Sequence, residues 1–125
     1  MTGYNVEIEA CSKDLTGKQK VQVKDTTDCV RLDALTAQNG NVVIDVDYWA
    51  ELSVHNEMAD NKDYKNYIIC DKDGTRYLTG SDAFWSSFMN IWEEMDGDDE
   101  PWKLKVYRQG SKNHPGKDFI TCSMI

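Results

Sequence analysis

The sequence has few of the residues that build covalent cross-links and metal sites. Its 125 residues include only two prolines, two histidines and four cysteines. Zinc-binding cysteines usually come in pairs about two to four residues apart, and no such pair is present here. The four are widely scattered: Cys11, Cys29, Cys70 and Cys122. We therefore expect reduced, structural thiols, and neither a metal nor another cofactor.

Long apolar runs are also lacking. No stretch approaches the roughly 18 apolar residues that a membrane-spanning helix requires, and residues 1–5 contain neither a basic nor an apolar signal segment. The sequence therefore predicts a cytoplasmic protein with no membrane partner. Its length of 125 residues is typical of one domain, expected here over 1–125.

A recognisable catalytic motif is absent as well. His55 and His114 are not accompanied by any local nucleophile motif. The Asp-Lys-Asp-Gly run at 71–74 lacks the third ligand and the terminal glutamate of a calcium loop, so it predicts a hairpin turn instead. We expect a protein that binds a partner and is not an enzyme.

Charge is unevenly distributed along the chain. The net charge is -8, yet residues 101–125 hold five Lys or Arg and a single Asp, whereas residues 1–100 hold nine Lys or Arg and 21 Asp or Glu. A negative average field repels nucleic acid, so only a local basic surface could bind it. The C-terminal quarter of the chain is where such a surface is expected.

Alternation of apolar and polar residues predicts a strand-rich fold. The longest alternating run, 42–55, puts Trp49 on the polar side, and a strand of this length twists strongly, as in a small barrel. Residues 26–40 are expected to be irregular. The predicted strands are 5–11, 19–25, 42–55, 64–70, 75–79, 102–107 and 119–124.

One helix is predicted. Ser81 is a natural N-cap, and a wide apolar stripe follows over about 82–95 until Gly97 and Pro101 end it. The order of elements predicts a mainly β, α+β protein. Its architecture would be a small OB-like Greek-key barrel or a curved antiparallel sheet, with the helix preceding a C-terminal β-hairpin.

The last hairpin is the best candidate for a binding surface. Lys103, Lys105 and Tyr107 alternate onto one face of their strand, and basic residues beside an aromatic ring suit single-stranded nucleic acid, where charge follows the phosphates and the ring stacks on a base. The expected phosphate contacts are Lys20, Lys24, Lys103, Lys105, Arg108, Lys112 and Lys117, and the expected stacking residues are Trp49, Tyr67 and Tyr107.

Several stretches, in order and over most of the chain, resemble the single-stranded DNA-binding protein of the protein-primed tailed phages. They are residues 15–18, 39–44, 73–77 with the Ser-capped helix, 102–106, and the loop and strand containing Ser111-Lys112, Gly116-Lys117 and Phe119. The resemblance implies an OB-like fold and sequence-independent binding of single-stranded DNA. It also implies a phage or mobile-element protein that protects DNA during replication or recombination in the host cytoplasm.

An acidic segment supports a different interpretation. Residues 93–100 hold six acids, which oppose the dipole at the predicted helix C-terminus. A solvated loop that maintains solubility explains them. Alternatively, the protein is a phage anti-defence inhibitor, of the DNA-mimic or anti-CRISPR type. It would then bind a host nucleic-acid enzyme through carboxylates that stand in for phosphates: Asp96, Asp98, Asp99 and Glu100.

Overall fold

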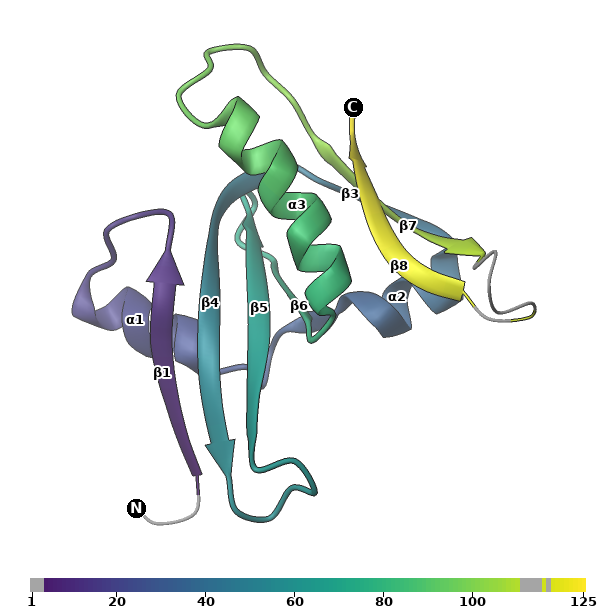
Figure 1. Cartoon of the computed structure of the whole chain (residues 1–125). Coiled ribbons are helices and arrows are strands. Elements are labelled where there is room, and N and C mark those ends of the chain that lie inside the picture. The colour runs from purple at the N-terminus through teal and green to yellow at the C-terminus, as the bar shows by residue number, and fades with distance from the viewer. Residues whose placement is uncertain (1–3, 111–115, 117) are drawn as a thin grey trace. The chain divides into compact units, whose positions relative to one another are not determined.

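The computed structural model describes residues 4–110, 116 and 118–125. With 44% strand and 26% helix, the protein is mainly β and of the α+β class, as predicted. In chain order the described elements are β1 (Tyr4–Cys11), α1 (Gly17–Lys24), β2 (Val30–Arg31), α2 (Leu32–Asn39), β3 (Asn41–Ile44), β4 (Val46–Asn56), β5 (Asp63–Asp71), β6 (Arg76–Thr79), α3 (Asp82–Met95), β7 (Leu104–Gly110) and β8 (Asp118–Met124) (Figure 1).

These elements form two compact units. Unit 1 comprises Met1–Val30 and Asp47–Gly80, and unit 2 comprises Arg31–Val46 and Ser81–Ile125. A five-stranded sheet has the order β1-β4-β5-β6-β2, and a three-stranded sheet has the order β3-β7-β8. Neither sheet closes into a barrel within the described residues. Of the two predicted architectures, the open sheet therefore describes the protein better.

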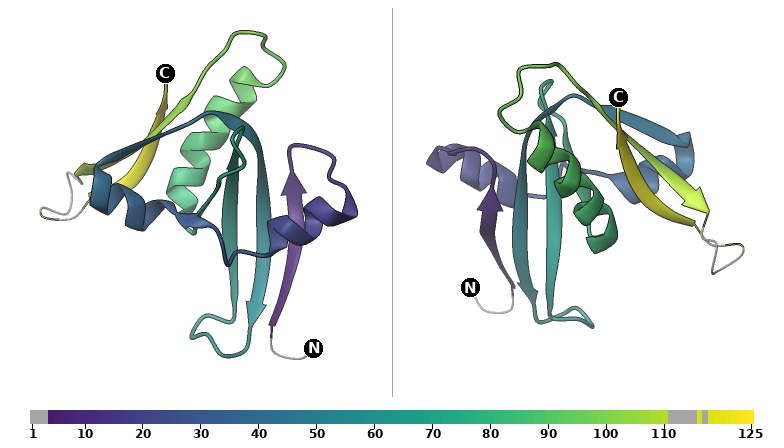
Figure 2. Two further views of the ribbon diagram at one scale, coloured as in Figure 1. Left: turned by 180° about the vertical axis from the view of Figure 1, so that it is seen from behind. Right: turned by 45° about the horizontal axis from the view of Figure 1, so that its top comes forward.

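The core of unit 1 lies between α1 and the five-stranded sheet. Val23 of α1 is fully buried against Ala50 and Leu52 of β4 and Ile68 of β5. The left view of Figure 2 shows α1 crossing in front of β1. α1 thus covers one face of the five-stranded sheet, and Val23 is its one fully buried side chain.

The prediction of a strand at 19–25 was wrong, because these residues form α1. Thr16 and Gln19 make a reciprocal capping box, in which each side chain accepts a hydrogen bond from the other's backbone N–H. The alternating valines resemble a strand pattern, but Val23 is buried while Val21 is 69% exposed. Residues two apart point in nearly opposite directions on a helix, so only one of them can face the core.

Residues 26–40 are not irregular, because they contain the short strand β2 and the helix α2. Within α2, Leu32 and Thr36 are buried, and the Thr36 hydroxyl donates a hydrogen bond to the Leu32 carbonyl oxygen at 2.8 Å. The predicted strand 42–55 is also interrupted, at Asp45, where β3 ends and β4 begins in the other sheet. Side-chain alternation continues across this break, so periodicity alone could not reveal the change of partner.

Unit 2 contains the best-predicted elements. Helix α3 has the predicted bounds, and the Ser81 hydroxyl caps it by accepting a hydrogen bond from the Phe84 N–H. The predicted C-terminal hairpin is formed by β7 and β8. α2 packs against β3 and β7, whereas α3 packs against β8. In the described part of the chain no helix has the length and apolarity needed to cross a membrane.

Aromatic rings continue from α3 toward the start of β7. The ring centroids of Trp85 and Phe88 lie 5.0 Å apart, and Phe88 is 6.3 Å from Trp92. Trp92 in turn meets Trp102 edge-on at 6.4 Å. Such contacts stabilise beyond simple burial. Three of the four tryptophans therefore belong to one packed row in unit 2.

None of the four cysteines, all of which the structure describes, is in a disulfide. Burial raises the pKa of Cys70 to about 11 and that of Cys122 to about 12. Because the thiolate is the reactive form, these two cysteines are chemically inert at neutral pH. They act as small apolar core residues.

Candidate nucleic-acid interface

One face of the three-stranded sheet in unit 2 is open to solvent. Along β7, Leu104 and Val106 are fully buried, while the alternate residues Lys105 and Tyr107 are half-exposed. Residues directly opposite each other in an antiparallel sheet share a face. From the register of the three strands, we define the open face as Asn41, Val43, Lys105, Tyr107, Gln109, Phe119, Thr121 and Ser123.

Tyr107 lies at the centre of the open face. Its hydroxyl is hydrogen-bonded to the Ser123 hydroxyl at 2.8 Å, and Lys105 Nζ lies 5.6 Å from its ring centroid. Phe119 is a diagonal neighbour on β8 and is 43% exposed. A cation over an exposed ring stabilises by only about 0.5–1 kcal/mol. A stacked base can therefore replace the lysine and leave its ammonium group for a phosphate.

Of the other lysines predicted for the hairpin, only Lys103 is among the described residues. Lys103 is exposed just before β7, where its N–H donates to the Ile125 carbonyl oxygen at 2.9 Å and its carbonyl oxygen accepts from the Ile125 N–H at 2.8 Å. These bonds extend the sheet by one pair beyond β7 and β8. Lys112 and Lys117 fall outside the described residues.

Arg108 is not placed for a phosphate contact, contrary to the prediction. It lies on the opposite face of β7 from Tyr107, where Nη1 pairs with Asp118 Oδ1 at 2.8 Å and Nη2 donates to the Asp33 carbonyl oxygen at 2.9 Å. The guanidinium joins β7 to β8 and to α2. Strand parity could have excluded it, since residues 107 and 108 must point to opposite faces.

Tyr67 is not available for base stacking either. It is 6% exposed, in a run of four consecutive buried residues on β5, 67–70. Consecutive burial means that both faces of this strand are covered. Alternation predicted a strand covered on one side only, with Tyr67 on its solvent-exposed face, whereas Tyr67 is buried.

The other three predicted contact residues belong to unit 1. Lys20 and Lys24 are exposed on α1 and line a cleft of about 640 Å³ beside β1, which also contains Glu7 and Glu9. Trp49 on β4 is half-buried. The mixed charge of this cleft is less suited to a polyanion than the open face is. We therefore define the candidate interface by unit 2 alone.

Phe119 and Val43 were missed as candidate contacts. Both are large apolar side chains on the open face, 43% and 47% exposed. The signal for Phe119 was present, because it alternates with Thr121 and Ser123 in a strand that was correctly predicted. Val43 could not be assigned, since its pairing with Lys105 depends on β3 joining the second sheet.

The acidic residues of the alternative interpretation follow α3. All four, Asp96, Asp98, Asp99 and Glu100, are exposed. Gly97 has a φ of +84°, which lets the chain reverse, and the Asp98 N–H donates to the Met95 carbonyl oxygen at 3.0 Å. The segment is thus an exposed turn at the negative end of a helix.

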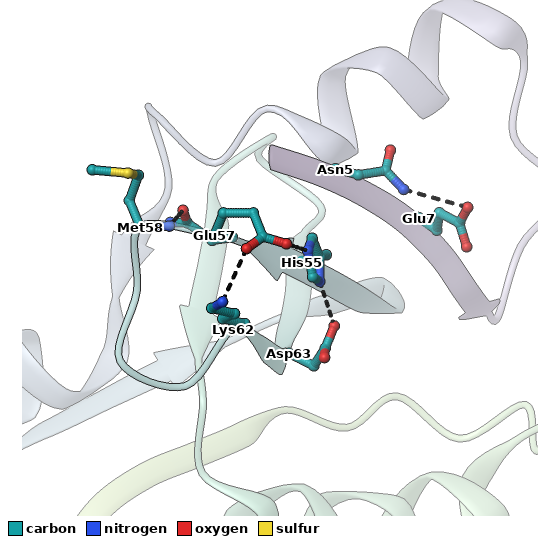
Figure 3. Close-up of polar contacts among 8 residues, drawn as sticks. Asn5, Glu7, His55, Glu57, Met58, Lys62 and Asp63 are labelled. Atoms are coloured by element: carbon teal, nitrogen blue, oxygen red, sulfur yellow. Dashed lines mark hydrogen bonds and ion pairs between the residues drawn. The ribbon is translucent and has the colours of Figure 1, made fainter. Parts of the chain in front are cut away.

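A second polar cluster lies at the tip of the β4–β5 hairpin in unit 1 (Figure 3). His55 Nδ1 is 2.7 Å from Asp63 Oδ1, and its Nε2 is 2.6 Å from Glu57 Oε1. Lys62 Nζ lies 3.1 Å from the other oxygen of Glu57. The bonds to Asp63 and Glu57 raise the pKa of His55, and the bonds from His55 and Lys62 lower the pKa of Glu57.

These shifts predict pH-dependent stability for the hairpin tip. The contribution of His55 is complete below its ordinary pKa of 6.5 and is lost as pH rises through the raised value. The contribution of Glu57 is present above its ordinary pKa of 4.5 and is lost as pH falls through the lowered value. Replacing His55 with Gln should flatten the dependence of the melting temperature on pH as the pH rises from about 6.5 through the raised pKa of His55. An NMR titration of the His55 ring with a midpoint at or below its ordinary value would contradict this.

Comparisons with known proteins assign no family to the chain. No family model, no curated protein and no solved structure matches it. Among residues 4–110, 116 and 118–125, no three His, Cys, Asp or Glu side chains are grouped to hold a metal ion. The class of the protein is therefore defined by its mainly β, α+β fold.

Proposed function

We propose that the protein binds single-stranded DNA, without sequence preference, through the open face of the β3-β7-β8 sheet. The observation that carries the proposal is the pair of accessible rings, half-exposed Tyr107 and exposed Phe119, beside Lys105 on a sheet face with no covering helix among the described residues. Stacking on such rings tolerates every base, because each base has a π-face.

The geometry favours a single strand over a duplex. A base must be unstacked from its neighbours before a ring can stack on it, which a duplex does not allow without disruption. The open face also offers few cations, so its binding energy must come largely from stacking. The resemblance of several stretches to phage DNA-binding proteins supports DNA as the nucleic acid.

The direct test is fluorescence anisotropy with an end-labelled oligothymidine of about 40 nucleotides, at low and moderate salt, with a labelled duplex as the control. A labelled oligonucleotide is preferable to intrinsic fluorescence, because Trp85, Trp92 and Trp102 are packed in a row and Trp49 belongs to unit 1. Binding of the single strand well above that of the duplex is expected. The absence of binding at low salt would overturn the proposal.

The hairpin lysines should set the salt dependence. Replacing Lys103 and Lys105 together with Ala should weaken binding at low salt and reduce the slope of log affinity against log salt by about 1.4, because each phosphate contact on a single strand contributes about 0.7. The matched control is the double replacement of Lys62 and Lys72, two exposed lysines of unit 1, which should leave the slope unchanged. Equal slopes for both variants would remove the hairpin lysines from the proposal.

The acidic turn supports a second candidate function. Its four exposed carboxylates could occupy the phosphate sites of a host nucleic-acid enzyme, such as a CRISPR nuclease. Replacing Asp96, Asp98 and Asp99 with Asn and Glu100 with Gln should then abolish inhibition of that enzyme. Under the first proposal, the same variant should bind DNA as well as the wild type or more tightly. The two functions are thus separated by one variant.

A further inference from the structure

An almost wholly apolar groove lies between the C-terminal half of α3 and the end of β8, both of which belong to unit 2. α3 packs against β8, and the two elements end on the same side of unit 2 (Figure 1). The groove has a volume of about 260 Å³, which is below the roughly 300–1,000 Å³ of small-molecule pockets. It is therefore better suited to an anchoring side chain of a protein than to a free small molecule. Its described lining residues are Asn90, Ile91, Glu94, Met95 and Met124.

Large apolar side chains are accessible at this groove. Met124 is 49% exposed, and Ile125, which directly follows β8, is 58% exposed. Ile91 and Met95 are half-buried and lie one helical turn apart on α3, so they share a face of the helix. Apolar side chains gathered in this way are typical of interaction sites.

The chain that forms the groove is strongly acidic. Residues 82–102 hold seven Asp or Glu and no Lys, Arg or His. Glu94 lines the groove itself, and the Asp98 N–H donates a hydrogen bond to the Met95 carbonyl oxygen at 3.0 Å, which holds the acidic turn beside the groove. The last turn of α3 has no basic residue to offset the negative end of the helix dipole. Lys103, just before β7, can offset only one of these charges.

We propose that this groove binds a basic amphipathic segment of a partner protein. An apolar side chain of the segment enters the groove, and its lysines or arginines face Glu94 and the acidic turn. Charge complementarity selects this occupant, because carboxylates covered by a partner need cations to offset their lost hydration. The same carboxylates repel a second copy of this chain, which carries -8, and they repel nucleic acid and anionic lipid as well.

The inference does not rest on DNA binding, because the groove and the open face lie on opposite sides of the sheet. Met124 is paired with the buried Leu104, whereas the open face takes the alternate residues of β8, such as Ser123. Met124→Ser should therefore bind single-stranded DNA as the wild type does. This variant also leaves the acidic turn intact, so it separates docking at the groove from the phosphate-mimicking function.

The test uses the full chain and a labelled synthetic peptide of about 14 residues, in which leucines at helical spacing form one face and lysines the other. Two control peptides have serine in place of every leucine, or glutamate in place of every lysine. Fluorescence anisotropy at about 0.15 M salt limits general attraction between charges. The leucine–lysine peptide should bind at least about tenfold more tightly than either control. Equal binding of the serine–lysine peptide, or no binding of the leucine–lysine peptide, would overturn the proposal.

Two variants at accessible positions locate the binding site, and melting curves verify that both fold. Met124→Ser removes apolar surface from the groove and should weaken binding of the leucine–lysine peptide at least about fivefold. Glu94→Lys should weaken it as well and should strengthen binding of the leucine–glutamate peptide.

The matched controls belong to unit 1. Met58→Ser truncates a 91% exposed methionine, and Glu7→Lys makes the same change in net charge at an exposed position of β1. Both should retain the affinity for the leucine–lysine peptide within about twofold, because salt screens charges outside the site. If Met124→Ser binds this peptide as the wild type does, or if Glu7→Lys weakens binding as much as Glu94→Lys, the groove is not the docking site.

Discussion

Replacing Tyr107 and Phe119 together with alanine is expected to lower the affinity for single-stranded DNA by about 30-fold or more. Base stacking contributes about 1–3 kcal/mol per base, so two lost stacks remove at least about 2 kcal/mol. The two rings are diagonal neighbours on the open face, and both are accessible. The measurement is the dissociation constant by anisotropy at constant salt, with the oligothymidine used above.

Two controls separate stacking from folding. Tyr107→Phe removes the hydrogen bond to Ser123 but keeps the ring, and should retain affinity within about twofold. Met58→Ala removes a 91% exposed side chain from unit 1 and should change nothing. If the double alanine variant binds as tightly as the wild type while remaining folded, the open face is not the DNA-binding surface.

Replacing Phe88 with alanine should lower the free energy of unfolding by about 3–5 kcal/mol. Phe88 is fully buried on α3 and is in ring contact with both Trp85 and Trp92. Its removal loses the transfer free energy of the ring and leaves a cavity among side chains that are held by their own packing. Urea unfolding followed by tryptophan fluorescence measures the change in the free energy of unfolding.

Ser86→Ala is the matched control for this substitution. Ser86 is exposed on the same helix, so its replacement should change stability by less than about 0.5 kcal/mol. A small effect of Phe88→Ala would mean that the aromatic row does not hold α3 in place. DNA binding by folded Phe88→Ala should remain near the wild-type level, because the residue is not on the open face.

The sequence predicted well wherever one local pattern decided the structure. α3 combines a serine cap, an apolar stripe over 14 residues and a terminal glycine, and all of these signals agree. The β7–β8 hairpin shows clean alternation on both strands. The turn at 71–74 was also predicted correctly, and Gly74 adopts a φ of +94° there.

Prediction failed where two local signals competed. Around α1, the capping box of Thr16 and Gln19 indicates a helix, whereas the valines at 21 and 23 indicate a strand. The helix formed, and of the two valines only Val23 joins the core of unit 1. The single-domain expectation over 1–125 and the resemblance to phage DNA-binding proteins stay predictions.

The sequence by itself determined the fold class, the terminal hairpin, the helix before it and the facing of Lys105 and Tyr107, because these follow from spacing within one element. Only the tertiary structure decided which surfaces are exposed to solvent. Tyr67 is buried because both faces of β5 are covered. Arg108 is tied to Asp118 and to the Asp33 carbonyl oxygen because β7 pairs with β8 and packs against α2. Burial and ion pairing depend on residues far apart in the chain, and periodicity within one strand contains no information about them.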